Sequence, residues 1–318
     1  MINLKRLESF LEISSEFPLS SNPFQTQWYL DTYTKHFCKK EDVFLFAFYN
    51  DGKSIGYGAF EKIENKMFLL GMKSVINGQE ITDYGDIVID SAYNNYFQEV
   101  WDKLQEWFLQ NGVQFLQLDY VREGSMTVNL FKDNSKEQIA APYITLPKTW
   151  DEYLLLLDRV DRKELKRKMR RLNTVTHDYI CVEKPTENDF EEFIRLHRLS
   201  SGEKDEFMSD AMKAFFWDLV NVEKKDWKTT LCFLQIEGKN VAAIISFENE
   251  SGVFGYNSGY DPSFNYYSVG LLLHAYKIKD AIEKRKKTYD FMRGTERYKY
   301  DLGGKDMKLY KIELMSEK

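Results

Sequence analysis

The sequence has few cysteines, and their arrangement argues against two kinds of stabilising site. Its 318 residues include only Cys38, Cys181 and Cys232. Their number is odd, they lie far apart, and no two show the CxxC spacing of zinc sites and redox motifs. Proteins held together by disulfide frameworks carry more cysteines at closer spacing. We therefore expect no disulfide framework and no metal site, and we interpret the three thiols as reduced and buried.

Long hydrophobic runs are also lacking. No stretch approaches the roughly 18 consecutive apolar residues that indicate a transmembrane helix. The N-terminal segment Leu4–Glu8 is already amphipathic, unlike the apolar centre of a signal peptide. We expect a soluble, cytoplasmic protein without a membrane span.

An excess of positive charge is lacking as well. The formal net charge is −6 and the isoelectric point is near 5.5. Such a chain has no general attraction for DNA or for acidic membranes, although a local basic patch can still bind an anion. We expect no DNA partner.

Apolar residues make up 43% of the chain and aromatic residues 15%. This composition supports packed cores and argues against disorder. The length suits two domains of roughly 150 residues each. Pro147 follows the last strand predicted in the first half, so we expect domains at residues 1–147 and 148–318.

Hydrophobic periodicity predicts the helices and strands. Helices are expected at Leu4–Phe17, Gln25–Phe37, Asn94–Asn111, Trp150–Leu157, Arg162–Leu172, Glu187–Arg198, Ser209–Val220 and Val269–Lys284. Strands are expected at Val43–Tyr49, Ser54–Lys62, Lys66–Leu70, Ile87–Ile89, Val113–Tyr120, Ala140–Leu146, Tyr179–Glu183, Thr230–Ile236, Asn240–Glu248, Val253–Gly259, Lys287–Met292 and Met307–Leu314.

The two halves follow the same plan. The segment Leu45–Gly56 can be laid over Leu231–Ala242, with an acidic-Gly-Lys turn at the same place in each. Two unrelated hairpins can share this turn chemistry, but the order of elements around them also matches. We therefore favour an internal duplication.

The segment around residues 265–271 opens an apolar helix. A pyrophosphate is held well by successive backbone N–H groups at a helix N-terminus. Ser268 and Gly270 are small enough to let the backbone approach a phosphate, and Ser268 is a plausible N-cap. The alternative is an ordinary capped core helix.

A second informative block lies near the end of the chain. There the apolar strand carrying Asp290 and Phe291 runs into Gly294 and then into a charged segment with the pair Tyr298–Lys299. With the turn at 259–262, the basic segment Arg162–Lys168 and Phe193-x-x-Leu196-His197, the region from Trp150 onward resembles the GNAT (Gcn5-related N-acetyltransferase) superfamily. More narrowly, it is similar to the CelD-like/BioF2-like branch, related to the FemABX transferases.

The resemblance implies an α/β fold with tandem GNAT-like domains, each a mixed, mostly antiparallel sheet flanked by helices. It also implies an acyl-CoA-dependent N-acyltransferase that uses acetyl-CoA or another acyl-CoA as co-substrate. The acceptor would be an amine of a sugar, a lipid or a cell-envelope or exopolysaccharide precursor. The residues expected at the donor are Asn265, Ser268, Val269, Gly270 and Leu271.

The chain departs from the family in its donor loop. The family pattern Gln/Arg-x-x-Gly-x-Gly/Ala falls on Asn265, Ser268 and Gly270, so only the last glycine is kept. The first half has no counterpart of this donor loop, because the segment Ser91–Asn95 occupies the equivalent position. We interpret the first half as a domain that kept the fold and lost the donor site.

Tyr298 is the candidate that the resemblance places beside the leaving thiolate, to which a phenol can donate a proton. The alternative is that Tyr298 packs and that Lys299 forms a salt bridge with Asp301 or Glu296. Two carboxylates are candidate bases for the amine. Glu248 ends a predicted strand, and Asp290 lies in an apolar strand where burial would raise its pKa. The alternative to a catalytic role is a solvated strand end for Glu248 and a cap of a neighbouring backbone group for Asp290. We interpret His197 as a helix-surface or cap histidine.

The basic helix supplies candidate phosphate contacts. Arg167 and Arg170 lie on one of its faces, and Arg293 and Lys299 follow the last predicted helix. Such a charge run is often only a solvated face. As an anion site it suits a nucleotide-sugar phosphate, an anionic glycan or a tRNA backbone. The last leaves open a FemABX-like aminoacyl-tRNA-dependent transferase, and a catalytically silent binding module is a third hypothesis.

Overall fold

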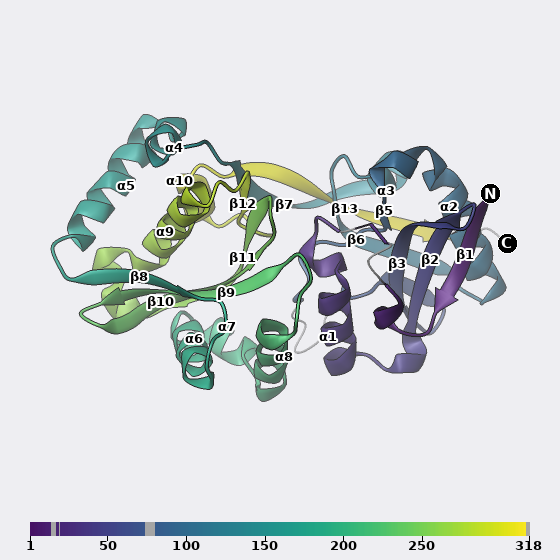
Figure 1. Ribbon diagram of the computed structural model, residues 1–318, viewed down its shortest axis with the longest axis horizontal. Coiled ribbons are helices and arrows are strands. Elements are labelled where there is room, and N and C mark those ends of the chain that lie inside the picture. The colour runs from purple at the N-terminus through teal and green to yellow at the C-terminus, as the bar shows by residue number, and fades with distance from the viewer. Residues whose placement is uncertain (14–16, 19, 74–79, 316–318) are drawn as a thin grey trace. The chain divides into compact units, whose positions relative to one another are not determined.

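The computed structural model describes residues 1–13, 17–18, 20–73 and 80–315, and it divides into two compact units (Figure 1). Unit 1 is Met1–Ala140 with Met307–Lys318, and unit 2 is Ala141–Asp306. The division lies close to the predicted one. The C-terminal segment, which we assigned to the second domain, belongs instead to unit 1.

Unit 1 contains helices and strands in the order β1 (Ile2–Leu7), η1 (Phe10–Glu12), η2 (Pro23–Gln25), α1 (Gln27–Phe37), η3 (Lys40–Asp42), β2 (Val43–Asn50), β3 (Lys53–Ile63), β4 (Lys66–Leu69), β5 (Val88–Ile89), η4 (Ser91–Tyr96), α2 (Phe97–Gln110), β6 (Phe115–Arg122), α3 (Met126–Leu130) and η5 (Lys132–Asn134). Its sheet has the order β1-β2-β3-β4-β6-β13, where β13 (Lys305–Met315) is the C-terminal strand. Neighbours are antiparallel except β4 and β6, which run parallel and are joined through α2.

Unit 2 begins within β7 (Ser135–Thr145) and continues with α4 (Trp150–Leu156), α5 (Arg159–Leu172), β8 (His177–Val182), α6 (Glu187–Leu199), α7 (Gly202–Phe207), α8 (Asp210–Asn221), β9 (Lys228–Ile236), β10 (Lys239–Glu248), β11 (Gly252–Tyr260), η6 (Pro262–Tyr267), α9 (Val269–Glu283), β12 (Thr288–Asp290) and α10 (Arg297–Asp301). Its sheet order is β8-β9-β10-β11-β12-β7. Again one pair is parallel, β11 with β12, and a helix, α9, joins its strands.

The two units therefore share one plan, as the sequence duplication predicts. Each unit completes its sheet with an antiparallel strand from the other half of the chain. The matching hairpins even share their turn geometry. Asp51 and Gly52 have φ of 48° and 83°, and Glu237 and Gly238 have 50° and 77°. Two successive left-handed residues are typical of the type I′ turns that suit the twist of a hairpin.

In unit 2, helices cover both faces of the sheet. Figure 1 shows α4, α5 and α9 on one side and α6, α7 and α8 on the other. The apolar face of α9 contributes Leu272, Ile278 and Ala281 to a core that also holds Tyr289. On the opposite face α6 approaches β11 closely, since a Cβ on Gly259 would lie 2.3 Å from the Cα of His197.

Some predicted elements differ. The helix predicted at Leu4–Phe17 is wrong, because Ile2–Leu7 forms the edge strand β1 and pairs with β2; residues 14–16 lie outside the described part. The leucines at 4, 7 and 11 mimic helical spacing, but Leu11 is exposed. The short helices α7 and α10 were not predicted, because one or two turns carry little periodic signal.

The expectation of three reduced thiols is also wrong. Cys181 and Cys232 form a disulfide, while Cys38 is free. The two cysteines are 51 residues apart, but they face each other directly in the pairing of β8 with β9. Sequence spacing does not reveal such a register. Among the described residues, no helix has the length and apolar character needed to cross a membrane.

Candidate functional site

The candidate donor site lies where β11 and β12 of unit 2 stop pairing. Their parallel ladder covers only Gly252–Phe254 opposite Thr288–Asp290. β11 then continues to Tyr260, whereas β12 ends. The second half of β11 therefore has no ladder with β12. On that side the Ser200 hydroxyl accepts from the N–H of Tyr260 and donates to its carbonyl oxygen.

The turn before α9 differs from the predicted N-cap. Ser268 adopts a left-handed conformation, with φ of 57° and ψ of 40°, and its side chain makes no capping hydrogen bond. Its backbone N–H donates to the carbonyl oxygen of Asn265. The first intrahelical bond runs from the Leu272 N–H to the Ser268 carbonyl. The N–H groups of residues 269–271 precede it and lack intrahelical acceptors, so the first turn can receive an anion.

Gly270 leaves little room in this turn. A Cβ at that position would lie 3.0 Å from the ring of Tyr260. Val269 is buried and Leu271 is half-buried. The side chains of this turn therefore serve packing, and its backbone is the part suited to bind a ligand.

Tyr298, the predicted proton donor, lies on α10. Its ring centroid is 4.8 Å from that of His274 and 6.2 Å from that of Phe291. Its hydroxyl has no hydrogen-bond partner among the residues that the structure describes. Burial raises the pKa of Tyr298, so the phenol keeps its proton at neutral pH and can donate it.

His274 is a neighbour that the sequence analysis missed. It is buried on α9, and its Nδ1 lies 2.9 Å from the hydroxyl of Tyr289. Burial lowers the pKa of His274 to about 3, so the imidazole is neutral. The sequence contains one sign of this residue, because a histidine interrupts the otherwise apolar run 271–275.

Lys299 holds the segment before Tyr298. Its ammonium donates to the carbonyl oxygens of Met292 (3.0 Å), Arg293 (2.8 Å) and Gly294 (3.2 Å), and it lies 2.9 Å from a carboxylate oxygen of Glu296. The ion pair with Glu296 is the alternative role that we considered for Lys299. Because these acceptors surround a buried ammonium, Lys299 is badly placed to meet a phosphate.

Asp290 supports the same segment. Its Oδ1 accepts a hydrogen bond of 2.8 Å from the N–H of Met292, which has a left-handed φ of 65°. The carboxylate is buried and stabilises this turn. This is the backbone-capping alternative for Asp290. Arg293 is half-buried at the end of that turn.

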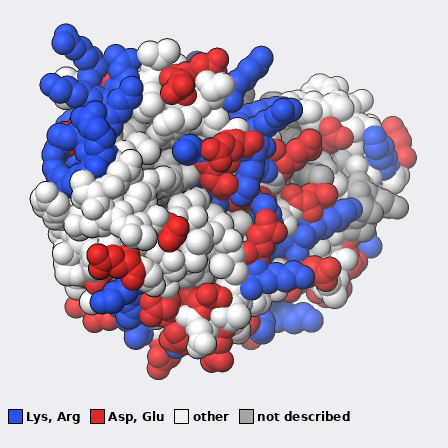
Figure 2. Space-filling model, turned by 60° about the vertical axis from the view of Figure 1, so that its left-hand side comes forward, with Lys and Arg blue, Asp and Glu red and all other residues white. Residues whose placement is uncertain are grey.

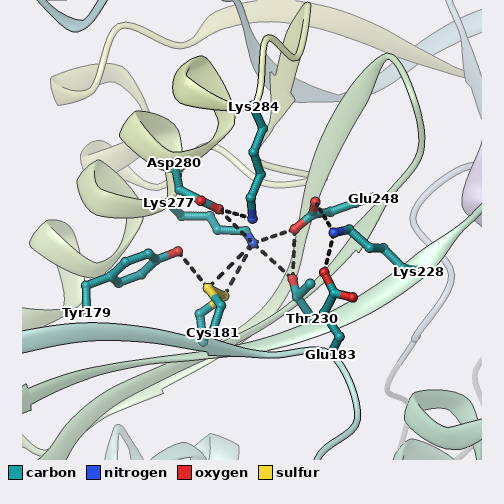
Figure 3. The surroundings of a disulfide bond; sticks show 10 residues. Tyr179, Cys181, Glu183, Lys228, Thr230, Glu248, Lys277, Asp280 and Lys284 are labelled. Atoms are coloured by element: carbon teal, nitrogen blue, oxygen red, sulfur yellow. Dashed lines mark hydrogen bonds and ion pairs between the residues drawn. A yellow bond between two sulfur atoms is a disulfide. The ribbon is translucent and has the colours of Figure 1, made fainter.

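Glu248 does not have the position expected of a base. It is fully buried, and its Oε1 lies 2.6 Å from the Nζ of Lys277 and accepts from Thr230 (Figure 3). Burial would raise the pKa of Glu248, but Lys277, Lys228 and Lys284 outweigh it and hold the value at about 2. A carboxylate held so firmly ionised is a poor proton acceptor. Glu248 is therefore part of the core, and the solvated strand end considered for it is also wrong.

Two further residues lie against β11. His197, expected on the helix surface, is buried, and burial lowers its pKa to about 3. Lys204 on α7 donates to the carbonyl oxygen of Ser258, in the half of β11 that β12 leaves unpaired. Lys204 was missed because α7 itself was not predicted.

The basic helix α5 contacts the turn before α9. Arg171 donates to the carbonyl oxygen of Tyr266 at 2.6 Å, and its guanidinium lies 4.6 Å from the centre of that ring. Arg167 instead binds Glu164 on its own helix, while Arg170 is exposed. The two arginines predicted to contact phosphate thus differ. Arg167 is paired with Glu164, whereas Arg170 is exposed to solvent.

Unit 1 holds an open pocket of about 400 Å³ whose lining includes Asn22, Asp86, Asn94 and Ser125. Oδ1 of Asp86 accepts hydrogen bonds from Thr127 Oγ1 (2.5 Å) and from the Ile87 N–H (2.8 Å). Burial raises the pKa of Asp86 to about 6. Asp86 was not predicted as a functional residue, because it lies in a loop without a recognised motif.

Comparison with known proteins agrees with this architecture. Residues 159–300 match the family described as "Acetyltransferase (GNAT) domain". No curated protein sequence matches significantly. The fold is similar to that of FemX (TM-score 0.63, 12% identity, 92% of this chain and 93% of the other). It is also similar to L-PGS from Bacillus licheniformis (0.56, 10%, 91% and 90%) and to a tandem GNAT protein from the clavulanic acid biosynthesis pathway (0.50, 8%, 100% and 99%).

These likenesses are low in sequence identity and therefore concern the fold. The match over residues 159–300 covers β8–β12 with α9, α10 and the basic helix α5. The other unit repeats the same sheet plan without contributing to that match. The chain is thus related to the GNAT superfamily, with a tandem fold whose structural neighbours include FemX.

Proposed function

We propose that this protein is an acyl-CoA-dependent N-acyltransferase that acts on an amine of a sugar, a lipid or a cell-envelope precursor. The observation that carries the proposal is the Tyr298 hydroxyl, which has no partner among the described residues and whose ring packs against His274 on α9. His274 follows the first turn of α9 by about one helical turn. A thiolate that leaves near that turn would therefore lie close to the protonated hydroxyl of Tyr298.

The remaining parts of the site suit the donor. The backbone N–H groups of Val269, Gly270 and Leu271 would hold the pyrophosphate of acetyl-CoA or another acyl-CoA, assisted by the helix dipole. The pantetheine arm would lie along the second half of β11, which has no ladder with β12. Asn265 fixes the turn through its carbonyl oxygen.

The proposed reaction is a direct transfer. The acceptor amine attacks the thioester carbon, a C–N bond forms and the C–S bond breaks. The thiolate takes the proton of Tyr298, and the proton lost by the amine passes through water and restores the phenol. Neither Glu248 nor Asp290 acts as the base in this scheme, because one is paired with Lys277 and the other caps Met292.

Calorimetric titration with acetyl-CoA and longer acyl-CoAs tests donor binding. Ser268→Asp should weaken binding by roughly tenfold or more, because it places a negative charge at the pyrophosphate. Ser268→Asn is the matched control, since Asn and Asp both tolerate a left-handed φ. Tyr298→Phe should keep affinity and lower the transfer rate by about 100-fold. Failure of every acyl-CoA to bind would rule the proposal out.

A FemABX-like aminoacyl-tRNA-dependent transferase is the second candidate, and the fold is similar to that of FemX over most of both chains. In that case charged tRNA would be retained on a filter, and Arg167→Glu with Arg170→Glu would abolish retention. If neither donor binds and an acceptor-like glycan does, the protein is a binding module.

A further inference from the structure

Three aliphatic side chains protrude where α4 meets α5. Leu155 is 70% exposed, Leu156 63% and Val160 73%. Single exposed apolar residues are common on protein surfaces, but three within six positions form a patch. The same segment supplies its core contacts through other residues, Tyr153, Leu154, Leu157 and Leu165. The three exposed side chains are therefore not required for packing of unit 2.

A cationic stripe continues from this patch along α5. Arg159, Lys163, Lys166 and Arg170 are all exposed and follow one another at helical spacing, so they lie on one face. The helix Arg159–Leu172 carries eight basic residues and two acidic ones, a net charge of +6, whereas the whole chain has −6. Figure 2 shows Lys and Arg gathered at the upper left, the corner that α5 occupies in Figure 1.

The cations of α5 that have partners, Arg167, Lys168 and Arg171, are not members of this stripe. Glu164 binds Arg167 and Lys168, and Arg171 binds Tyr266. By contrast, no residue in the described part of the chain makes a hydrogen bond or ion pair with the side chains of Lys163, Lys166 or Arg170. The stripe thus presents uncompensated positive charge beside an exposed aliphatic patch.

We propose that this α4–α5 corner, formed by Leu155, Leu156, Val160 and the stripe Arg159, Lys163, Lys166 and Arg170, docks the protein on the surface of an anionic phospholipid bilayer. The aliphatic side chains enter the boundary between headgroups and acyl chains, and the ammonium and guanidinium groups meet lipid phosphates. Apolar insertion combined with basic charge is the usual basis of peripheral attachment to anionic membranes.

The composition of the corner separates this partner from a nucleic acid. A phosphate backbone attracts the same cations, but recognition of single-stranded RNA relies on aromatic side chains that stack on bases. None of the seven residues is aromatic, and three protruding aliphatic side chains gain nothing from a phosphate backbone. The inference does not depend on the donor or the reaction proposed above.

Vesicle sedimentation with the full chain tests this inference. The protein should sediment with vesicles of phosphatidylcholine containing phosphatidylglycerol, remain free with phosphatidylcholine alone, and dissociate as salt rises, because surface charges are screened. Lys163→Glu, Lys166→Glu and Arg170→Glu together should lower the partition coefficient by about 100-fold or more.

The aliphatic side chains are tested separately. Leu155→Gln, Leu156→Gln and Val160→Gln together leave the charge unchanged and should lower the partition coefficient by roughly tenfold or more. The control is Leu11→Gln with Leu109→Gln, which are 78% and 45% exposed in unit 1 and should change nothing. Unchanged melting temperatures would show that all variants are folded.

Two outcomes would overturn the inference. One is the absence of sedimentation with anionic vesicles. The other is a partition that the glutamine variants leave intact, especially if filter binding then shows RNA retention that only the charge-reversal variant loses. That second pattern would identify the stripe as a nucleic-acid surface.

Discussion

The Nζ of Lys277 lies 2.6 Å from Oε1 of Glu248, and solvent reaches neither side chain. Lys277 comes from α9 and Glu248 from the end of β10. Thr230 Oγ1 lies 2.9 Å from both atoms, and Sγ of Cys232 lies 3.3 Å from the ammonium (Figure 3). This pair ties α9 to β10 of the sheet, so the geometry of the candidate site depends on a buried charge network.

Removing one partner of this pair should be costly. Lys277→Met leaves the Glu248 carboxylate buried without its counterion and should lower the free energy of unfolding by about 3–5 kcal/mol. Urea denaturation measures this change. Lys277→Met combined with Glu248→Gln should recover much of the loss. The control is Lys279→Met on the same helix, whose contact with Glu283 is exposed and 3.9 Å long; it should shift stability by less than about 0.5 kcal/mol.

The same pair predicts sensitivity to acid. The pKa of Glu248 is about 2 in the folded protein, against an ordinary value of 4.5. A lowered carboxyl pKa stabilises the folded state above the unfolded pKa, and that stabilisation is lost as the pH falls from about 4.5 towards 2. The wild type should therefore lose about 3 kcal/mol more than the Glu248→Gln/Lys277→Met variant over this range. Parallel stability curves for the two proteins would contradict the prediction.

The disulfide between Cys181 and Cys232 should stabilise unit 2. It closes a loop of 51 residues, and restricting such a loop in the unfolded chain is worth up to about 4 kcal/mol. Replacing both cysteines by alanine, or adding a reductant to the wild type, should lower the denaturation midpoint. Cys38→Ala removes a free thiol and should leave the effect of the reductant intact. An identical midpoint with and without reductant would speak against the bond.

Gly259 should tolerate no side chain. A Cβ there would lie 2.3 Å from the Cα and 2.4 Å from the N of His197, and both of these His197 atoms belong to the backbone of α6. Gly259→Ala should separate α6 from β11, lower the free energy of unfolding by about 2 kcal/mol or more, and disturb the nearby contact of Lys204 with Ser258. Gly202→Ala is the matched control, because nothing lies within 4 Å of its Cβ position. Thermal melts of the two variants should differ clearly.

Local signals in the sequence predicted most of the fold. The hairpins at Asp51–Gly52 and Glu237–Gly238 were recognisable because their turns require left-handed residues. The long helices α2, α6 and α9 carry enough apolar periodicity to be identified, and the capping chemistry around them is local. The edge strand β1 was mistaken for a helix, because its leucine spacing fits both structures and only its pairing with β2 distinguishes them.

The candidate site was predicted less completely. Tyr298 was named from the family resemblance and the first turn of α9 from its small residues, and their roles stay predictions. His274, Lys204 and the role of Lys299 were not identified, because each depends on partners that only folding brings near. His274 meets Tyr289 across 15 residues, and Lys204 meets Ser258 across 54.

The sequence by itself determined most of the long helices and strands and the duplication, because these follow from short-range periodicity and turn chemistry. The tertiary structure decided which side chains are buried together. It turned Glu248 from a candidate base into the partner of Lys277, joined Cys181 to Cys232, and left the stripe on α5 without partners in the described part of the chain. The charge state and reactivity of a side chain depend on its burial and on neighbours distant in sequence. Strand register and helix packing decide which residues become such neighbours.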